Sequence, residues 1–281
     1  MKNVISFMGA NYVAREVHWH MPDGWMQGEN AVHAWFSPIE TFPERFDAML
    51  GAVKALGFDA FDIWNAQLNR AWATQEHLAA ARDLLKGRAI TVPTMAGDFG
   101  ATLDELRSVC RVAKAVGASI LSGGTPLLSQ RRGELVSELR RQRLRLAVEN
   151  HADRTPEELL GRLGDGDEDV VGVAADTGWF GTQGYDAARA LDALAGRLFH
   201  VHMKDVKARR AQKTGFQLID MGHETCRLGA GIVPVAECAR VLRRRGYAGP
   251  IAIEHEPEDS DPGEDCRASL VYLRRLLEER P

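Results

Sequence analysis

The chain has 281 residues, of which 45% are apolar, 26% are charged and 7% are aromatic. A chain of this length buries roughly 75% of the surface that its unfolded form exposes, so a large core is expected. This composition excludes disordered, collagen-like and coiled-coil proteins. The formal net charge of -4 at pH 7 argues against a protein that binds nucleic acid, because such proteins usually carry an excess of basic residues.

Hydropathy and cysteine usage indicate the cellular compartment. No apolar run approaches the roughly 18 residues of a membrane-spanning helix. The first twenty residues lack the apolar region and the cleavage site of a secretory signal peptide. The four cysteines form no CxxC pair, which is typical of reduced thiols in a large chain. We therefore expect a cytoplasmic protein without a membrane partner.

Short apolar runs alternate with helical patterns along the whole chain. The predicted strands cover residues 3–7, 58–63, 89–94, 118–122, 144–149, 170–176, 198–203 and 251–255. The predicted helices cover about residues 41–55, 74–86, 102–116, 130–142, 156–163, 184–195, 233–245 and 262–279. Several helices begin with capping signals, such as Thr102 with Glu105, and Thr155-Pro156 with Glu158.

Strict alternation of eight strands with eight helices predicts parallel strands joined by crossover helices. Closure into a (β/α)8 TIM barrel leaves no edge strand, so the sequence predicts one such domain over residues 1–281. The alternative, an open doubly wound sheet, usually has a glycine-rich turn after its first strand, where Gly9 stands alone. Two long loops, 8–40 and 204–230, follow the first and seventh strands and would lie at the catalytic mouth of the barrel.

The last four strands place polar residues at their carboxyl ends. Alternation puts their bulky residues on one face, which suits the outer helices, so the other face must point into the barrel. On that inner face the strands end in Glu149, Asp176, His202 and Glu254. Three converging carboxylates repel one another unless a cation neutralises them. Three carboxylates with one imidazole suit one divalent ion, Mn²⁺ first, with Mg²⁺, Co²⁺ or Zn²⁺ as alternatives.

The motifs around these residues carry a family resemblance. ENH at 149–151, DTGW at 176–179, HVHMKD at 200–205 and IEHE at 253–256 resemble the sugar phosphate isomerase/epimerase family of xylose-isomerase-like TIM barrels. The strong part of the resemblance covers about residues 144–257, including RLGAGIVP and GYAGPIAIEHE. It implies that the four residues hold one divalent ion. It also implies that Glu149 and Glu254 act as acid and base on opposite faces of a bound sugar.

Chemistry of this kind removes a proton next to a carbonyl and passes through an enediolate, which a divalent ion stabilises. The sequence departs from the ketose 3-epimerases of the family at two positions. Trp179 stands where they have a histidine, and Ala208 stands where they have an arginine. The string HMKDV at 202–206 looks more like the inosose dehydratase branch of the family. Lys204 would then polarise a carbonyl or donate a proton to a leaving hydroxyl, unless it pairs with a local carboxylate such as Asp205.

Further residues are candidates for the same site. His151 follows Glu149 by two positions and is a candidate base or ligand of a substrate oxygen. His200 lies one layer deeper than His202, where it would support the metal ligands or pack in the core. Glu256 could orient a base or pair with Lys204. Substrate contacts are expected from Trp64, Trp179, His223 and Arg227.

Four functions remain open at this point. The first is a metal-dependent isomerase or epimerase of a keto- or aldo-sugar or a related polyol. The second is a lyase on the same scaffold, which dehydrates an inosose or ketosugar or eliminates from a 3-keto-glycoside. A nuclease resembling endonuclease IV is disfavoured, because the second and third predicted strands end without histidine. The fourth is a non-catalytic sugar-binding protein. The expected partner is a small carbohydrate, and a dimer or tetramer is possible for this family.

Overall fold

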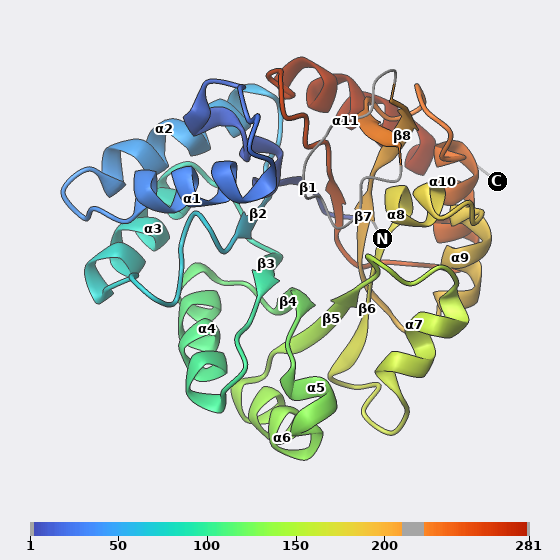
Figure 1. The fold of residues 1–281 in the computed structure, drawn as a ribbon, viewed down its shortest axis with the longest axis horizontal. Coiled ribbons are helices and arrows are strands. Elements are labelled where there is room, and N and C mark those ends of the chain that lie inside the picture. Colours follow the sequence, from blue (N-terminus) through green and yellow to red (C-terminus); the bar gives the residue numbers. More distant parts are fainter. Residues whose placement is uncertain (1–2, 210–221, 280–281) are drawn as a thin grey trace.

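The computed structural model describes residues 3–209 and 222–279, and its main feature is a closed parallel barrel (Figure 1). The barrel strands follow the order β1-β10-β7-β6-β5-β4-β3-β2, and each pair of neighbours is parallel. They are β1 (Ile5–Met8), β2 (Phe61–Trp64), β3 (Thr94–Asp98), β4 (Ile120–Gly124), β5 (Arg145–Glu149), β6 (Val171–Asp176), β7 (Leu198–Met203) and β10 (Ile251–Ile253). The predicted (β/α)8 barrel is therefore confirmed.

Helices surround the strands (Figure 1). Those that connect successive barrel strands or close the chain are α2 (Phe42–Ala55), α3 (Gln75–Gly87), α4 (Leu103–Val116), α6 (Arg132–Gln142), α7 (Pro156–Leu163), α9 (Ala187–Leu194), α10 (Val235–Arg244) and α11 (Gly263–Glu278). The predicted caps are present: Thr102 and Glu105 form a reciprocal capping box on α4. Thr155 accepts a hydrogen bond from the Glu158 amide at the start of α7. These bonds satisfy amide groups that a helix leaves unpaired at its first turn.

Several predicted boundaries were wrong. The third strand, expected at 89–94, is observed at Thr94–Asp98. Pro93 has no amide hydrogen to donate and Thr91 makes only an isolated bridge to Ala60, so regular pairing begins one residue after the proline. The helix expected at 184–195 is limited to α9, and α8 (Thr177–Thr182) precedes it because Asp176 caps that segment. The short helix α5 (Leu127–Gln130) precedes α6.

The two long loops contain regular structure. Segment 8–40 folds into two 3-10 helices, η1 (Gly9–Tyr12) and η2 (Arg15–Val17), followed by α1 (Trp25–Phe36). Segment 204–230 contributes the antiparallel strands β8 (Asp205–Ala208) and β9 (His223–Cys226), and its residues 210–221 lie outside the described part. Both segments follow barrel strands at their carboxyl ends, so they form part of the mouth of the barrel.

Side-chain size separates the two faces of the barrel. The bulky residues Leu146, Val173, Val201 and Ile251 belong to the main core with the helices. Inside the barrel, Ile120, Ala147 and Ala174 form a small separate cluster against Phe199. The alternation predicted for the last four strands is thus observed except at Phe199, which was expected on the outer face but packs against this inner cluster where the register of the β6–β7 pairing shifts.

Asp205 fixes the chain just after β7. Its carboxylate is fully buried and accepts four backbone hydrogen bonds, from Val206 and Val233 on Oδ1 and from Gly229 and Gly231 on Oδ2, at 2.9–3.0 Å. These bonds hold the turn at 229–233 against β8. All four cysteines are buried and free, and no helix among the described residues is long and apolar enough to cross a membrane.

Substitution of Asp205 by Asn is expected to destabilise the fold. One carboxylate oxygen becomes an NH₂ group that faces two amide donors, and each buried donor left without an acceptor costs about 1–3 kcal/mol. The melting temperature should fall by about 5–10 °C in a calorimetric scan. Glu40→Gln, on an exposed loop, is the control and should leave the melting temperature within about 1 °C. An Asp205→Asn protein as stable as the parent would show that these bonds do not stabilise the fold.

Candidate metal centre

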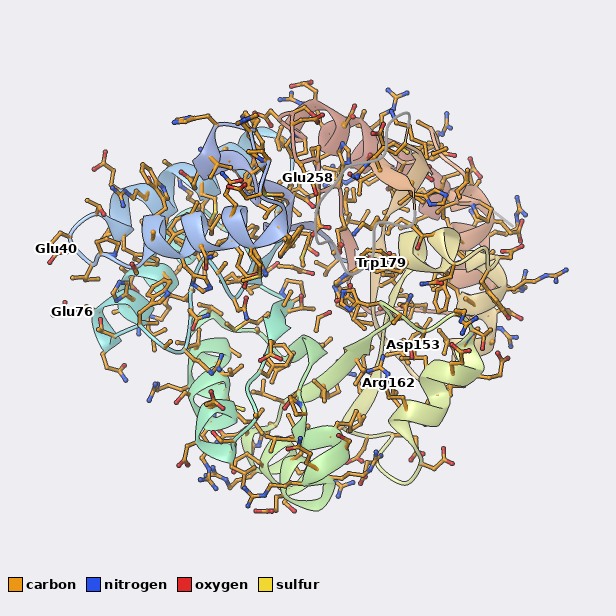
Figure 2. All side chains as sticks on the ribbon, in the orientation of Figure 1. Glu40, Glu76, Asp153, Arg162, Trp179 and Glu258 are labelled. Carbon is orange, nitrogen blue, oxygen red and sulfur yellow. The ribbon has the colours of Figure 1, made fainter. Side chains whose placement is uncertain are left out.

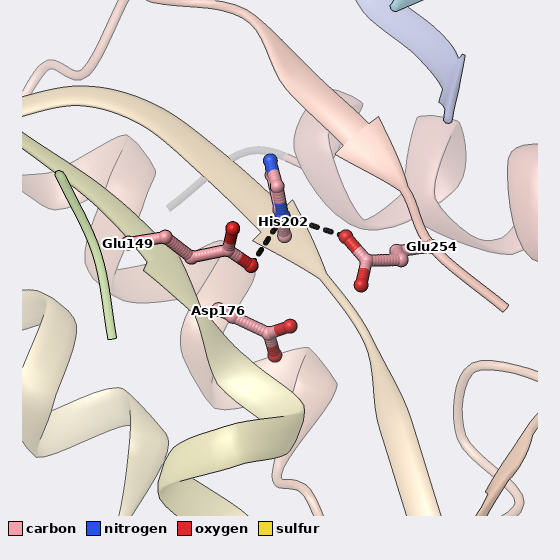
Figure 3. A group of neighbouring side chains, drawn as sticks. All are labelled: Glu149, Asp176, His202 and Glu254. Atoms are coloured by element: carbon pink, nitrogen blue, oxygen red, sulfur yellow. Dashed lines mark hydrogen bonds and ion pairs between the residues drawn. The ribbon is translucent and has the colours of Figure 1, made fainter. Parts of the chain in front are cut away.

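The structure brings the four predicted ligands together at the carboxyl ends of their strands. One ligand atom from each of Glu149, Asp176, His202 and Glu254 lies within 4.8 Å of the other three (Figure 3). His202 Nδ1 lies 3.0 Å from Glu149 Oε1 and 2.6 Å from Glu254 Oε2. Two carboxylates therefore converge on one ring nitrogen, which carries at most one hydrogen to share between them.

Hydrogen bonds from other strands orient these side chains. His202 Nε2 lies 3.1 Å from the Ser122 hydroxyl of β4, which turns Nδ1 toward the two glutamates. Asn150 forms two hydrogen bonds with the backbone of Asp176, at 2.8 and 3.0 Å, and so joins the ends of β5 and β6. Asp176 Oδ1 accepts the Gly178 and Trp179 amides at 2.7 and 3.0 Å, which leaves Oδ2 for another partner.

Burial and charge determine the protonation of the group. Burial raises the pKa of Asp176 to about 7, and the neighbouring glutamates add to this against the opposing effect of Lys204. Burial alone would lower the pKa of His202, but Glu149 and Glu254 outweigh it and raise that pKa well above its usual value. A protonated imidazole thus supplies positive charge where three carboxylates meet.

The donor set fits a divalent metal ion. Asp176 Oδ2 is buried without a hydrogen-bond partner, and it lies with two further carboxylates around one imidazole. A hydrogen bond from Nε2 to Ser122 would leave the Nδ1 lone pair of a neutral His202 available to a metal. Oxygen-rich sites with one imidazole suit Mg²⁺, Mn²⁺ and related ions. Glu149, Asp176, His202 and Glu254 would hold such an ion, in place of the proton that His202 otherwise needs.

Lys204 brings a buried cation to the same place. Its Nζ lies 2.7 Å from Glu254 Oε1, 2.8 Å from Glu256 Oε2 and 3.6 Å from Asp176 Oδ2. Only 4% of its side chain is exposed, and it lies over the Trp179 ring at 5.0 Å. The alternative partner Asp205 is excluded, because both of its oxygens are occupied by backbone amides.

A cavity of about 1150 Å³ opens above this group. Its lining includes several predicted residues: Glu149, His151, Trp64, Trp179, Lys204, His223, Glu254 and Glu256. His151 is half-exposed, with Nε2 3.7 Å from Glu149 Oε1, and it packs edge-on against Trp179 (labelled in Figure 2). Two of the four candidate ligands, Glu149 and Glu254, thus share one open space with the candidate substrate-binding side chains, while Asp176 and His202 are buried behind them.

Two predicted residues, Arg227 and His200, do not line the cavity. Arg227 is exposed and does not line the cavity, because the chain turns away after β9 and the next amide, of Leu228, binds the Ser269 hydroxyl of α11. His200 lies beneath the site, as expected, with its ring 4.7 Å from that of His202. Its Nε2 is 2.9 Å from Asp62 Oδ2, and both side chains are fully buried.

Sequence reasoning missed several supporting residues. Ser122, Asn150 and Asp62 received no role, although the alternation of β4 places Ser122 on the inner face beside Ile120 and Gly124. Thr177 was also missed: its hydroxyl accepts the Lys204 amide at 2.9 Å and donates to the Lys204 carbonyl at 2.7 Å. These contacts join different strands of the barrel, some neighbouring and some across from each other, and only the closed barrel reveals them.

Part of the cavity wall is formed by glycines, which present their backbone and no side chain. Gly97 of β3 and Gly123 of β4 are paired and have φ values of +136° and +145°, which glycine alone adopts readily. A Cβ atom on Gly123 would lie 2.0 Å from the Gly97 carbonyl oxygen, and one on Gly97 would lie 2.3 Å from the Asn65 side chain. No larger side chain fits at either position.

Comparison with known proteins identifies the family. Residues 50–276, which include all four ligands, match the family described as xylose isomerase-like TIM barrel, and the chain belongs to it. This confirms the resemblance found in the motifs. The two inosose dehydratases of Mesomycoplasma hyopneumoniae, from strains 7448 and 232, are each 27% identical over 119 residues. The matched segment is 40% of this chain and 40% of the length of each relative.

Solved structures share the fold at low sequence identity. A xylose isomerase-like TIM barrel protein from Mycobacterium smegmatis, in complex with magnesium, is 16% identical with a TM-score of 0.69 and covers 99% of this chain and 98% of its own. An L-ribulose 3-epimerase is 13% identical with a TM-score of 0.61, over 88% of this chain and 92% of its own. These likenesses concern the barrel itself.

Purified protein is expected to contain about one equivalent of a divalent metal by elemental mass spectrometry. The double variant Glu149→Gln, Glu254→Gln lacks two of the three negative charges of the candidate ligand group, so it should not bind the metal. The matched control is Glu256→Gln, which changes a carboxylate 2.8 Å from Lys204 but outside the ligand group, and it should retain the metal. In the parent, chelation should lower the melting temperature and Mn²⁺ should restore it. A parent that stays metal-free after incubation with Mn²⁺, Mg²⁺, Co²⁺ and Zn²⁺ would contradict the assignment.

Proposed function

We propose that this protein is a divalent-metal-dependent enzyme that moves a proton on the carbon next to a carbonyl group of a small carbohydrate or polyol. The observation that supports this most directly is the position of Glu149 and Glu254. Both contact the same His202 nitrogen, and both line the cavity. A substrate carbon above the ligand group would therefore lie between two carboxylates, which is the arrangement that proton transfer requires.

The residues would divide the chemistry as follows. A divalent ion at this site would polarise the substrate carbonyl and stabilise the negative charge that develops on its oxygen. One glutamate takes the proton from the carbon, and the other glutamate or a neighbouring acid returns a proton to the substrate. His151 and Trp179 border the space beside Glu149 and would help to position the sugar.

The first candidate reaction is isomerisation or epimerisation of a keto- or aldo-sugar. Here the proton returns to the same carbon on its other face, or to the neighbouring carbon, so two carboxylates on opposite sides are sufficient. The shared barrel of the L-ribulose 3-epimerase supports this reaction. The substitution of Trp179 for the histidine of ketose 3-epimerases indicates a substrate other than a free ketose.

The second candidate is dehydration, and the position of Lys204 favours it. The two glutamates are not equivalent, since Glu254 pairs with the Lys204 ammonium whereas Glu149 faces His151. In a dehydration, a glutamate removes the α-proton, the electron pair forms a carbon–carbon double bond, and the β-hydroxyl leaves as water with a proton from the ammonium. The inosose dehydratase relatives support this reaction.

The remaining assignments belong to the same proposal. Mn²⁺ is the ion we expect first, and the M. smegmatis protein in complex with magnesium supports a hard divalent ion. The four free thiols agree with a cytoplasmic location, and the acidic net charge agrees with a carbohydrate rather than a nucleic acid as partner. Whether the chain forms dimers or tetramers stays a prediction.

The Mn²⁺-loaded protein is expected to exchange the α-proton of a suitable ketosugar, inosose or 3-keto-glycoside for deuterium in D₂O. Glu149→Gln and Glu254→Gln should each slow this exchange by about 10²-fold or more, because each removes one acid–base group. Exchange is followed by proton NMR and compared at equal metal loading, with Glu40→Gln, on an exposed loop outside the cavity, as the control. A fully loaded protein that binds these sugars and exchanges no proton would instead be a sugar-binding protein.

Lys204→Gln separates the two candidate reactions. If Lys204 protonates a leaving hydroxyl, formation of the enone, followed by its ultraviolet absorbance, should slow by about 10²–10⁴-fold, while deuterium exchange changes far less. Lys207→Gln is the control, since Lys207 also lines the cavity and pairs with Glu224 at 3.2 Å. A substrate that rearranges without losing water, at equal rates in parent and variant, would favour the isomerase.

A further inference from the structure

The cavity has two unlike halves. The ligands come from β5, β6, β7 and β10, which are consecutive around the barrel. The strands that complete the other side of the ring include β1, β2 and β3, and α1 lies in the connection from β1 to β2 (Figure 1). Besides the polar residues Asp23, Glu29, Asn65 and Asp98, this second half contributes six apolar side chains to the lining: Met8, Ala10, Trp25, Met26, Trp64 and Ala96. We call these six residues the apolar wall.

Two tryptophans form the centre of the apolar wall. The rings of Trp25 and Trp64 pack edge to face, with an interplanar angle of 64° and centroids 5.6 Å apart. Trp64 is 5% exposed, and Gln67 fixes its backbone by accepting the Trp64 amide at 3.2 Å and donating to the Gly9 carbonyl at 3.0 Å. The indole surface that faces the cavity is therefore held in place before any ligand arrives.

Met26 extends the wall to the cavity mouth. Its side chain is 59% exposed, one of few large apolar side chains exposed to this degree among the described residues. A flexible, polarisable thioether beside two fixed indole rings suits contact with an apolar or aromatic group. An apolar surface inside a cavity is also typical of a ligand site rather than of an ordinary protein surface.

Charge on the rest of the rim disfavours an anionic substrate. Carboxylates line it at Asp23, Glu29, Asp98, Glu224, Glu256, Glu258, Asp259 and Asp265. Of the described basic residues in the lining, Lys204 and Lys207 are already paired with glutamates, and Arg209 also has an interaction partner. A phosphorylated sugar would meet repulsion from most of this rim. A neutral sugar would meet no such electrostatic repulsion.

We propose that the substrate is a neutral glycoside whose apolar aglycone lies against the apolar wall while its oxidised sugar ring lies at the metal centre. The placement of the sugar ring at the metal centre rests on the proposed function, whereas the placement of the aglycone against the apolar wall does not. The cavity of about 1150 Å³ is larger than one sugar ring requires and exceeds the roughly 300–1,000 Å³ typical of pockets for drug-sized ligands. The wall and the ligand group lie on opposite sides of the ring, so one molecule must extend across the cavity to contact both.

The test measures binding of paired glycosides to the Mn²⁺-loaded protein. The probes are the phenyl and methyl glycosides of glucose, galactose, mannose and xylose, with dissociation constants from isothermal titration calorimetry. In at least one pair, the phenyl glycoside should bind about tenfold or more tightly than the methyl glycoside, because only the phenyl group reaches the indole rings. Trp25→Ala should reduce that preference to within about twofold, and Met26→Ser should reduce it partly.

Trp35→Ala is the matched control. Trp35 also lies on α1, is 39% exposed and stacks under Arg45 outside the cavity, so its loss should leave the preference unchanged. Circular dichroism verifies the fold of each variant. Equal affinities within every pair, no measurable binding of any phenyl glycoside, or an unchanged preference in a folded Trp25→Ala protein would overturn the proposal.

The same titration separates this inference from the proposed function. In the Glu149→Gln, Glu254→Gln protein, which is expected to lack the metal, the preference for phenyl over methyl should persist at weaker affinity. If the parent binds no metal but still prefers phenyl glycosides, the apolar wall stands and the proposed chemistry fails. If the parent binds metal and exchanges protons without any phenyl preference, the chemistry stands and the glycoside assignment fails.

Discussion

Repulsion between three buried carboxylates is the constraint on which the rest of this site depends. Glu149, Asp176 and Glu254 lie within reach of one point, at the end of a barrel where little water screens their charges. Two cationic side chains, His202 and Lys204, compensate part of this negative charge, and both contact Glu254. A metal ion would take over part of this compensation. The arrangement would therefore couple metal affinity to the protonation of His202, because the same nitrogen would serve both.

The barrel makes this concentration of charge possible. Each ligand is the last inward-facing residue of its strand, and small residues such as Ala147 and Ala174 fill the layer below. The candidate ligands are held by groups on other strands, as when Ser122 of β4 contacts His202 of β7 across the barrel. Rigid strands thus position the polar groups, while the segments that follow β1 and β7 supply the more variable surroundings of the substrate.

The sequence was sufficient to predict the fold and the convergence of the four candidate ligands, since both depend on local periodicity. Alternation within strands predicts which residues face inward, and the spacing of strands predicts that Glu149, Asp176, His202 and Glu254 share one end. It failed where the outcome depends on a single backbone detail: Pro93 displaced the third strand, and Asp176 created a helix directly after the sixth. It also missed Asn150 and Thr177, because their partners lie 26 and 27 residues away on a neighbouring strand. α1 was predicted as loop because Gly24 offers no capping side chain before it, no acidic residue stands in its first turn and Gly28 lies within it.

The paired glycines of β3 and β4 limit how this cavity can change in evolution. Neither Gly97 nor Gly123 tolerates even a methyl group, so the wall that they form keeps one shape whatever the substrate. New specificity must then arise elsewhere, through α1 or through the β8–β9 pair, which carry larger side chains and lie outside the barrel itself. A lineage of such proteins could exchange one substrate for another while the backbone surface at β3 and β4, and the ligand group facing it, stayed unaltered.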